Sequence, residues 1–165
     1  MARNPDFEKG NILSILCARE QVTGDFCIMN ADHVFSRLIL EKVFQPVGRI
    51  TAVCDFDRPL GDDDMKIIRK PDGTLARMEK TLEPYDGGYI GITLVPKEKA
   101  AVYWAGARQV RQRLGEGASV EKVLNLLAEQ GEPIDILDVS GDVWFEVDTE
   151  EDLAVAEEKI RKMEI

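Results

Sequence analysis

The sequence is poor in the residues from which disulfides and structural zinc sites are made. It has three cysteines and one histidine in 165 residues. Cys17, Cys27 and Cys54 stand apart among apolar residues, and no CxxC pair is present. A histidine-based zinc cluster is excluded and a disulfide framework is disfavoured, so buried thiols in a reducing compartment are expected.

Long apolar runs and excess positive charge are also missing. No stretch approaches the roughly 20 apolar residues that cross a bilayer, and the opening MARNPDFEKGN has no apolar core of a signal peptide. These features predict a cytoplasmic protein without a membrane span. The formal net charge of −10 disfavours nucleic acid as a partner. A small phosphorylated substrate stays compatible, because it needs only one or two local cations or a divalent metal.

The chain alternates between segments with strand and helix patterns. This alternation predicts an α/β fold with a mostly parallel sheet and helices on both faces, formed by residues 1–165 as one unit. A last helix, capped by Thr149 with Asp152 three residues on, has an apolar stripe of Leu153, Ala156, Ile160 and Met163. The other expected helices span 11–19, 34–44, 97–114 and 119–130, and the strands span 25–30, 49–56, 65–69, 74–79, 89–95, 134–139 and 143–147.

Two acidic positions follow or end apolar strands. Asp32 follows the strand over 25–30 after one residue, Ala31, and an acid delivered to the end of a sheet strand can hold Mg²⁺. The alternative is that Asp32 caps the helix beginning near Val34, with His33 packed beside it. Glu146 and Asp148, two residues apart, share one face of a strand just before the last helix, where two carboxylates repel unless they are solvated, protonated or bridged by a cation. The alternative is a capping Asp148 and a solvent-facing Glu146.

Two further features are weaker signals taken singly. Lys80 ends the second strand of the hairpin over 65–79, and its compact charge suits phosphate, although a solvated edge lysine is the commoner case. Gly10 and Asn11 precede a helix and would let the backbone approach a ligand, or form only a turn.

Read together, these residues resemble a known superfamily. Their order is Asn4-Pro5, Gly10-Asn11 and Ser14, then FCIMNADHVF, Met78-Glu79-Lys80, Tyr89–Ile92 and WFEVDTEEDLAVAE. The series resembles the nucleotidyltransferases of sugar-nucleotide synthesis, and most of all the CTP:inositol-1-phosphate cytidylyltransferases. It implies a nucleotide-diphospho-sugar transferase-like, Rossmann-type fold over essentially the whole chain.

The resemblance assigns roles by position. It implies that Asp32 binds Mg²⁺ and that Glu146 is the second metal ligand, in a place where the family has aspartate. Lys80 matches the lysine that contacts the acceptor's phosphate, and Gly10 and Asn11 match the segment that approaches the nucleotide base. Tyr89 occupies a position where the family tends to have an acid, which leaves the acceptor's identity open.

The family's Gly-rich loop for the triphosphate has no counterpart before Arg3. The resemblance therefore implies an N-terminally incomplete domain, the C-terminal two-thirds, with an open sheet edge. The implied reaction is Mg²⁺-dependent transfer from an NTP, expected to be CTP, to a phosphorylated polyol or sugar such as inositol 1-phosphate, with release of pyrophosphate. A homodimer or a partner chain that supplies the missing segment is a possible assembly. The alternatives are a non-catalytic acceptor-binding or regulatory subunit, and a module that pairs its strand edge with another chain.

Overall fold

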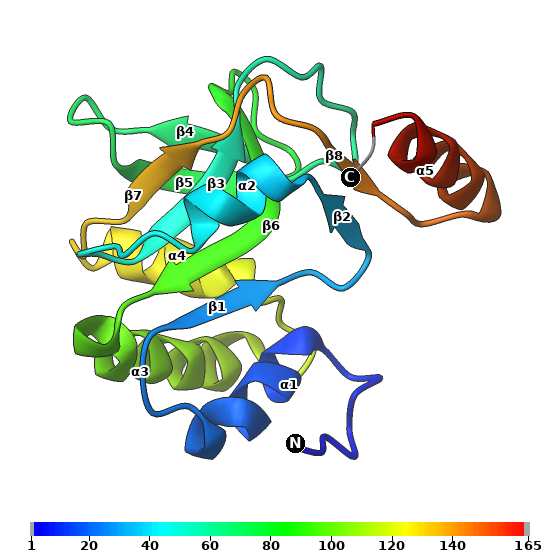
Figure 1. Ribbon diagram of the computed structural model, residues 1–165. Coiled ribbons are helices and arrows are strands. Elements are labelled where there is room, and N and C mark those ends of the chain that lie inside the picture. Colours follow the sequence, from blue (N-terminus) through cyan, green and yellow to red (C-terminus); the bar gives the residue numbers. More distant parts are fainter. Residues whose placement is uncertain (1, 164–165) are drawn as a thin grey trace.

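A mixed six-stranded sheet forms the centre of the protein. In the computed structural model, which describes residues 2–163, the strand order is β5-β4-β6-β3-β7, and β1 also pairs with β6. Figure 1 shows helices on both faces of this sheet, so the predicted α/β class is confirmed. The strands are β1 Phe26–Met29, β3 Thr51–Asp55, β4 Lys66–Arg69, β5 Leu75–Glu79, β6 Gly87–Val95 and β7 Asp135–Asp138.

The direction of β6 differs from the mostly parallel sheet that the sequence predicted. β1, β3 and β7 share one direction, but β6 lies between β1 and β3 and runs antiparallel to both. Among the described strands, only β3 and β7 form a parallel pair. All nine residues of β6 are buried. A strand covered on both faces is apolar throughout, whichever way it runs, so its sequence does not reveal its direction.

Two cores lie on opposite faces of the sheet, and β6 contributes to both. Successive side chains of a strand point to opposite faces: Ile90 and Ile92 pack with α2 (Arg37–Val43), and Tyr89 packs in the larger core. The larger core is closed by three helices, α1 Asn11–Ala18, α3 Lys97–Leu114 and α4 Glu121–Glu129. A short 3₁₀ helix, Arg19–Gln21, follows α1.

A second sheet of two strands replaces the expected start of the helix over 34–44. β2 (His33–Phe35) pairs with β8 (Trp144–Glu146), and α2 begins only at Arg37. Ser36 is the N-cap, because its hydroxyl accepts a hydrogen bond from the Ile39 N–H at 3.5 Å. The alternative that Asp32 caps this helix is therefore wrong. Val34 and Phe35 are β-branched and aromatic, and pairing with β8 outweighs their helical spacing.

The last helix, α5 (Glu150–Met163), projects from the side of the molecule (Figure 1). Its predicted cap is confirmed: Thr149 Oγ1 accepts from the Asp152 N–H at 3.1 Å, and the Asp152 carboxylate accepts from the Thr149 N–H at 3.0 Å. Its predicted apolar stripe is only partly covered, since Ala156 is buried but Leu153 is 49% exposed; the side chain of Met163 lies outside the described residues. Across residues 2–163, no helix is both long and apolar enough to traverse a bilayer.

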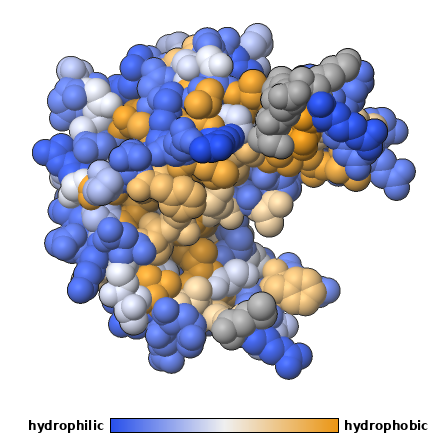
Figure 2. Space-filling view, in the orientation of Figure 1, coloured by the Kyte–Doolittle hydropathy of each residue, from blue (hydrophilic) through white to orange (hydrophobic). Residues whose placement is uncertain are grey.

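The β1 edge of the central sheet is open. Of the strands that the structure describes, only β6 pairs with β1. Beside β1 lies a hollow of ≈ 220 Å³ lined by residues that include Phe26, Cys27, Phe44 and Val95. Figure 2 shows a hollowed apolar region in the middle of this face. The expected open sheet edge is thus present at β1.

Candidate functional site

Pairing of β2 with β8 brings two distant acids together. His33 lies opposite Glu146 in the antiparallel register, and the Val147 N–H donates to the Asp32 carbonyl at 2.8 Å. Ligand atoms of Asp32, His33 and Glu146 all lie within 4.8 Å of one another. The two acids that the sequence placed on separate strand ends therefore form one cluster, whereas Asp148 lies beyond the end of β8.

His33 holds this cluster in place. Its Nδ1 lies 2.8 Å from Asp32 Oδ1, and its ring stacks on the Trp144 ring at 5.6 Å between centroids and 4° between planes. The His33 side chain is 5% exposed, while the Asp32 side chain is half-exposed. His33 thus fixes one oxygen of Asp32 and leaves the rest of the carboxylate open to solvent or a ligand.

The pKa of Glu146 is raised above its ordinary value. Burial is the main cause; His33 opposes it, while the negative charges of Asp148, Asp32 and Asp64 add to it. The cluster therefore has two carboxylates in a place where their charges repel. A hard divalent cation prefers oxygen ligands, and the donor set of Asp32 and Glu146, with one half-exposed carboxylate for access, fits Mg²⁺.

A pocket of ≈ 230 Å³ extends from this cluster to the predicted phosphate-binding lysine. Lys80 follows β5, and its ammonium lies 3.7 Å from the exposed Asp63. The structure thus brings Lys80, His33 and Glu146 to one pocket, with Asp32 bonded to His33. The lining residues are Asn30, His33, Asp63, Asp64, Met65, Lys80, Tyr89, Gly91, Ser119, Glu121, Trp144 and Glu146.

Gly10 and Asn11 are not among the residues that line this pocket; they contact the loop that precedes α4. A Cβ at Gly10 would lie 2.5 Å from the Glu116 carbonyl oxygen, so only glycine permits this close approach. Asn11 Oδ1 accepts from the N–H of Val120, the N-cap residue of α4, at 2.8 Å. In the described structure, Gly10 and Asn11 contact the loop that contains Ser119, and Ser119 lines the pocket.

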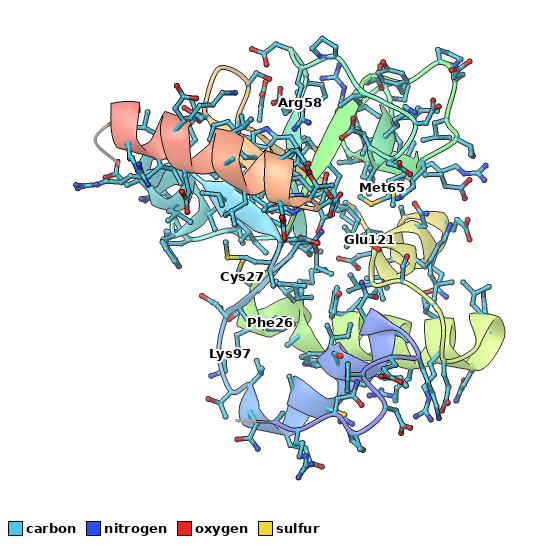
Figure 3. All side chains as sticks on the ribbon, turned by 90° about the vertical axis from the view of Figure 1, so that its right-hand side faces the viewer. Phe26, Cys27, Arg58, Met65, Lys97 and Glu121 are labelled. Carbon is cyan, nitrogen blue, oxygen red and sulfur yellow. The ribbon has the colours of Figure 1, made fainter. Side chains whose placement is uncertain are left out.

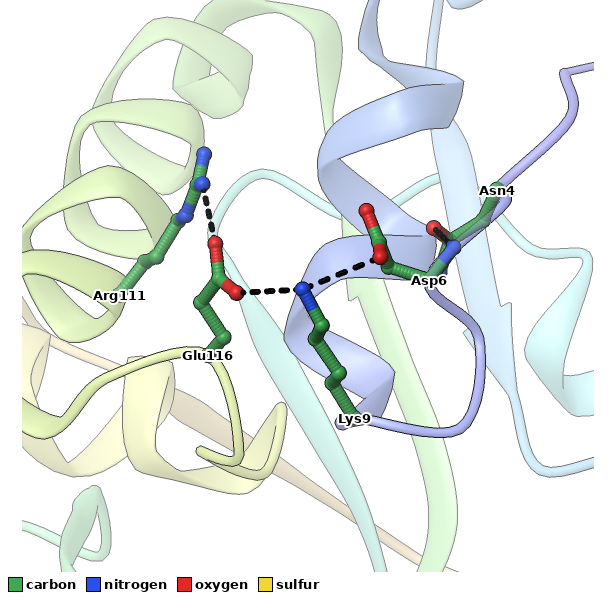
Figure 4. A network of polar contacts seen from close by, with 5 residues as sticks. All are labelled: Asn4, Asp6, Lys9, Arg111 and Glu116. Atoms are coloured by element: carbon green, nitrogen blue, oxygen red, sulfur yellow. Dashed lines mark hydrogen bonds and ion pairs between the residues drawn. The ribbon is translucent and has the colours of Figure 1, made fainter.

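An exposed ion-pair network joins the same two segments (Figure 4). Lys9 Nζ lies 3.1 Å from both the Asp6 and the Glu116 carboxylates, and Arg111 binds the other Glu116 oxygen at 2.6 Å. These pairs lower the pKa of Glu116. Exposed pairs stabilise little singly, but together with Gly10 and Asn11 they fix where α4 begins.

Sequence reasoning missed the support behind Trp144. Its Nε1–H donates to Asp55 Oδ2 at 2.9 Å, and the Arg58 guanidinium lies 4.2 Å from the Trp144 ring centroid. Burial of Asp55 opposes its ionisation, yet hydrogen bonds from Trp144 and from the Asp57 N–H outweigh it and lower the Asp55 pKa. No local sequence signal links these residues, because the pairing of distant strands brings them together.

Tyr89 contributes no free hydroxyl to the pocket. Its ring is buried and its hydroxyl is 2.8 Å from Thr93 Oγ1. Burial, together with the negative charge of Glu121, raises the pKa of Tyr89. Gly91, two residues on, has φ +78, and a Cβ there would lie 2.9 Å from Asn30 Cγ, so glycine is needed to admit Asn30 to the pocket.

Comparisons with known proteins agree with this architecture. No family model matches the chain. The solved structure of the inositol-1-phosphate CTP transferase from T. maritima superposes with a TM-score of 0.75 at 19% identity, covering 93% of this chain and 62% of that one. CTP:phosphocholine cytidylyltransferase from Streptococcus pneumoniae superposes with a TM-score of 0.64 at 14% identity, covering 95% and 67%. The chain therefore has the nucleotidyltransferase fold.

The chain is also similar in sequence to a bifunctional protein named as a transferase and a synthase. The chain is 27% identical over 168 residues to the "Bifunctional IPC transferase and DIPP synthase" of Rubrobacter xylanophilus, which covers 97% of this chain and 36% of that protein. The chain thus spans about a third of that relative's length. The similarity confirms the resemblance to inositol-phosphate cytidylyltransferases that the sequence motifs indicated.

Proposed function

We propose that the chain carries the metal-binding and acceptor-binding part of a nucleotidyltransferase site. The reaction transfers a nucleotidyl group from an NTP, with CTP the expected donor, to a phosphorylated polyol or sugar such as inositol 1-phosphate, and releases pyrophosphate. The observation that carries this proposal is the cluster of Asp32, His33 and Glu146, because two of its members, His33 and Glu146, line a pocket together with Lys80. The names of the Rubrobacter relative and the T. maritima structure support the same chemistry.

The residues suit this reaction chemically. A phosphate oxygen of the acceptor forms a bond to the α-phosphorus of the NTP, and the bond to the pyrophosphate oxygen breaks with its electron pair leaving on pyrophosphate. Catalysis of such a step is mainly positioning and charge neutralisation. Asp32 and Glu146 would hold Mg²⁺, which supplies that neutralisation when bound. Lys80 binds the acceptor phosphate as a point charge, and His33 keeps Asp32 oriented.

Other sequence expectations stay proposals. These are the single-domain organisation, the cytoplasmic location, the nucleotide contact of Gly10 and Asn11, and the pairing of the open β1 edge in a homodimer or with a partner chain. The contacts of Gly10 and Asn11 with the loop before α4 favour an indirect effect on the site.

The test is Mg²⁺-dependent pyrophosphate release with a panel of nucleoside triphosphates and phosphorylated acceptors. It is run on this chain and on a chimera that adds the N-terminal segment of the Rubrobacter relative. We expect release that requires CTP, inositol 1-phosphate and Mg²⁺ together. Silence from both folded proteins, with no binding of inositol 1-phosphate, would contradict the proposal.

A further inference from the structure

Glu121 stands out among the residues that line the pocket. It is the first residue of α4 and is only 9% exposed. No described residue makes a hydrogen bond or an ion pair with its carboxylate, which nonetheless lines the pocket. Figure 3 shows it at the start of α4 beneath Met65, on the side of the helix toward the middle of the molecule.

The carboxylate of a glutamate can accept several hydrogen bonds, and no described residue donates one to Glu121. The nearby donor groups on Tyr89 and Lys122 do not bind the Glu121 carboxylate. The Tyr89 hydroxyl is engaged with Thr93, and Lys122, on the same helix, points to Glu79 at 3.4 Å. The first turn of α4 favours a negative charge at this position. Because Glu121 lines the pocket, a ligand bound there would supply the donors that the described residues do not.

The chain holds Glu121 in place from outside the pocket. Asn11 Oδ1 binds the Val120 N–H at 2.8 Å, immediately before Glu121, and the Ile12 N–H donates to the Ala118 carbonyl at 3.4 Å. The close approach of Gly10 to Glu116 fixes the loop one turn earlier. A binding group that is pre-positioned by its surroundings loses little entropy when a ligand arrives.

We propose that Glu121 is a specificity-determining residue whose carboxylate accepts hydrogen bonds from hydroxyl groups of a phosphorylated polyol, while Lys80 binds the phosphate of that polyol. This inference rests on the proposed function, because it assigns the acceptor class of the same site. Asn30 and Ser119, which also line the pocket, offer further groups that pair with hydroxyls.

Hydroxyl groups fit this pocket better than a quaternary ammonium group. A quaternary ammonium has no N–H to donate and is bound chiefly by open aromatic faces. The ring of Trp144 is already engaged by Arg58 at 4.2 Å and by His33 at 5.6 Å, and Tyr89 is buried. Glu121 and the amide of Asn30 instead offer hydrogen-bonding groups.

Calorimetric binding with three probes tests the assignment. The probes are inositol 1-phosphate, methyl phosphate and phosphocholine, and the proteins are the wild type, Glu121→Gln and Glu98→Gln. Glu98 is an exposed glutamate in the first turn of α3 and serves as the matched control. We expect Glu121→Gln to weaken inositol 1-phosphate by about 10- to 100-fold, the range for a hydrogen bond to a charged group, and to leave methyl phosphate unchanged.

Several results would overturn the inference. These are unchanged binding of inositol 1-phosphate by Glu121→Gln, no binding of it by the folded wild type, or tighter binding of phosphocholine that depends on Glu121. Thermal unfolding separates binding from structure: Glu121→Gln breaks no hydrogen bond or ion pair with a described residue, so the ligand-free melting temperature should stay nearly unchanged. A lower melting temperature would indicate a structural role instead.

The inference and the proposed function can fail separately. Polyol-phosphate binding that depends on Glu121, without any pyrophosphate release, would contradict nucleotidyl transfer and leave the acceptor class standing. Pyrophosphate release that Glu121→Gln does not change at low acceptor concentration would support nucleotidyl transfer and contradict the role of Glu121.

Discussion

The two ends of the pocket differ in how their charged groups are arranged. At the acidic end, Asp32, His33 and Glu146 come within 4.8 Å of one another, and His33 is hydrogen-bonded to Asp32 and stacked on Trp144. At the other end, Lys80 is half-exposed, and Glu121 has no partner among the described residues. Two neighbouring carboxylates suit a cation. Two separate groups of opposite charge, Lys80 and Glu121, suit the two parts of one ligand: an anionic phosphate and its hydroxyl-bearing body.

The largest effect is expected from removal of the Asp32 carboxylate, at the metal end of the pocket. We expect Asp32→Ala to lower Mg²⁺-dependent turnover by about 10³-fold, the scale of losing a main electrostatic contributor, and to abolish Mg²⁺ binding. The change should hardly alter stability, since the side chain is half-exposed. Pyrophosphate release in an active form and calorimetric Mg²⁺ titration measure the effects.

Asp62→Ala is the matched control for this variant, because Asp62 is an exposed acid outside the pocket lining. It should behave as the wild type. Substantial turnover by purified Asp32→Ala would remove Asp32 from the metal site.

The next effect is expected at the opposite end. Lys80→Met should weaken methyl phosphate and inositol 1-phosphate alike, by about 10- to 100-fold, because both use the same charge-assisted contact. Mg²⁺ binding should stay unchanged. Lys97→Met, at an exposed lysine of α3, controls for loss of one positive charge. Equal loss of Mg²⁺ and phosphate binding would show that the two ends are not separate.

Trp144 supports the acidic end from behind. Trp144→Phe removes the donor to Asp55 Oδ2 and leaves a buried acceptor unpaired. The free energy of unfolding should fall by about 1–3 kcal/mol, and Mg²⁺ binding should weaken because His33 loses part of its stacking surface. Denaturant unfolding measures the first effect. Trp104→Phe is the comparison: Trp104 makes ring contacts with Phe26 and Tyr103, and a smaller loss there is expected.

Asn11 should give the smallest effect, at the acceptor end. Asn11→Ala removes the acceptor of the Val120 N–H, which should cost about 1 kcal/mol of stability and weaken inositol 1-phosphate a few-fold through displacement of Glu121. Asn11→Asp keeps an acceptor oxygen and should restore both. If the KM for CTP rises in Asn11→Ala while the KM for the acceptor does not, Asn11 acts on the nucleotide instead.

How far the sequence leads depends on whether the signal is local. The Thr149 and Asp152 cap and the hairpin of β4 and β5 were predictable because each is set by residues a few positions apart. The direction of β6 was not, since a strand buried on both faces has the same pattern either way. β2 was mistaken for helix because its partner β8 is far along the chain.

The residues of the site also differ in whether the sequence alone could identify them. The motif residues Asp32, Glu146 and Lys80 could be named from the sequence. In the structure Glu146 and Lys80 line one pocket, and Asp32 is clustered with Glu146 beside it. Glu121 could not be named from the sequence. The helix dipole favours a glutamate in the first turn even when it is exposed, so its presence there does not indicate a binding site. The structure shows that Glu121 is buried and that Asn11 of α1 binds the residue before it.

A crystal structure with Mn²⁺ and inositol 1-phosphate tests the central claim most directly, because anomalous scattering locates the metal without assumption. We expect Mn²⁺ at about 2.1–2.2 Å from carboxylate oxygens of Asp32 and Glu146, near the range for small divalent cations. The acceptor phosphate should contact Lys80 and its hydroxyls Glu121. Mn²⁺ bound elsewhere, with Asp32 and Glu146 free of metal while the acceptor is present, would contradict the division of the pocket into a metal end and an acceptor end.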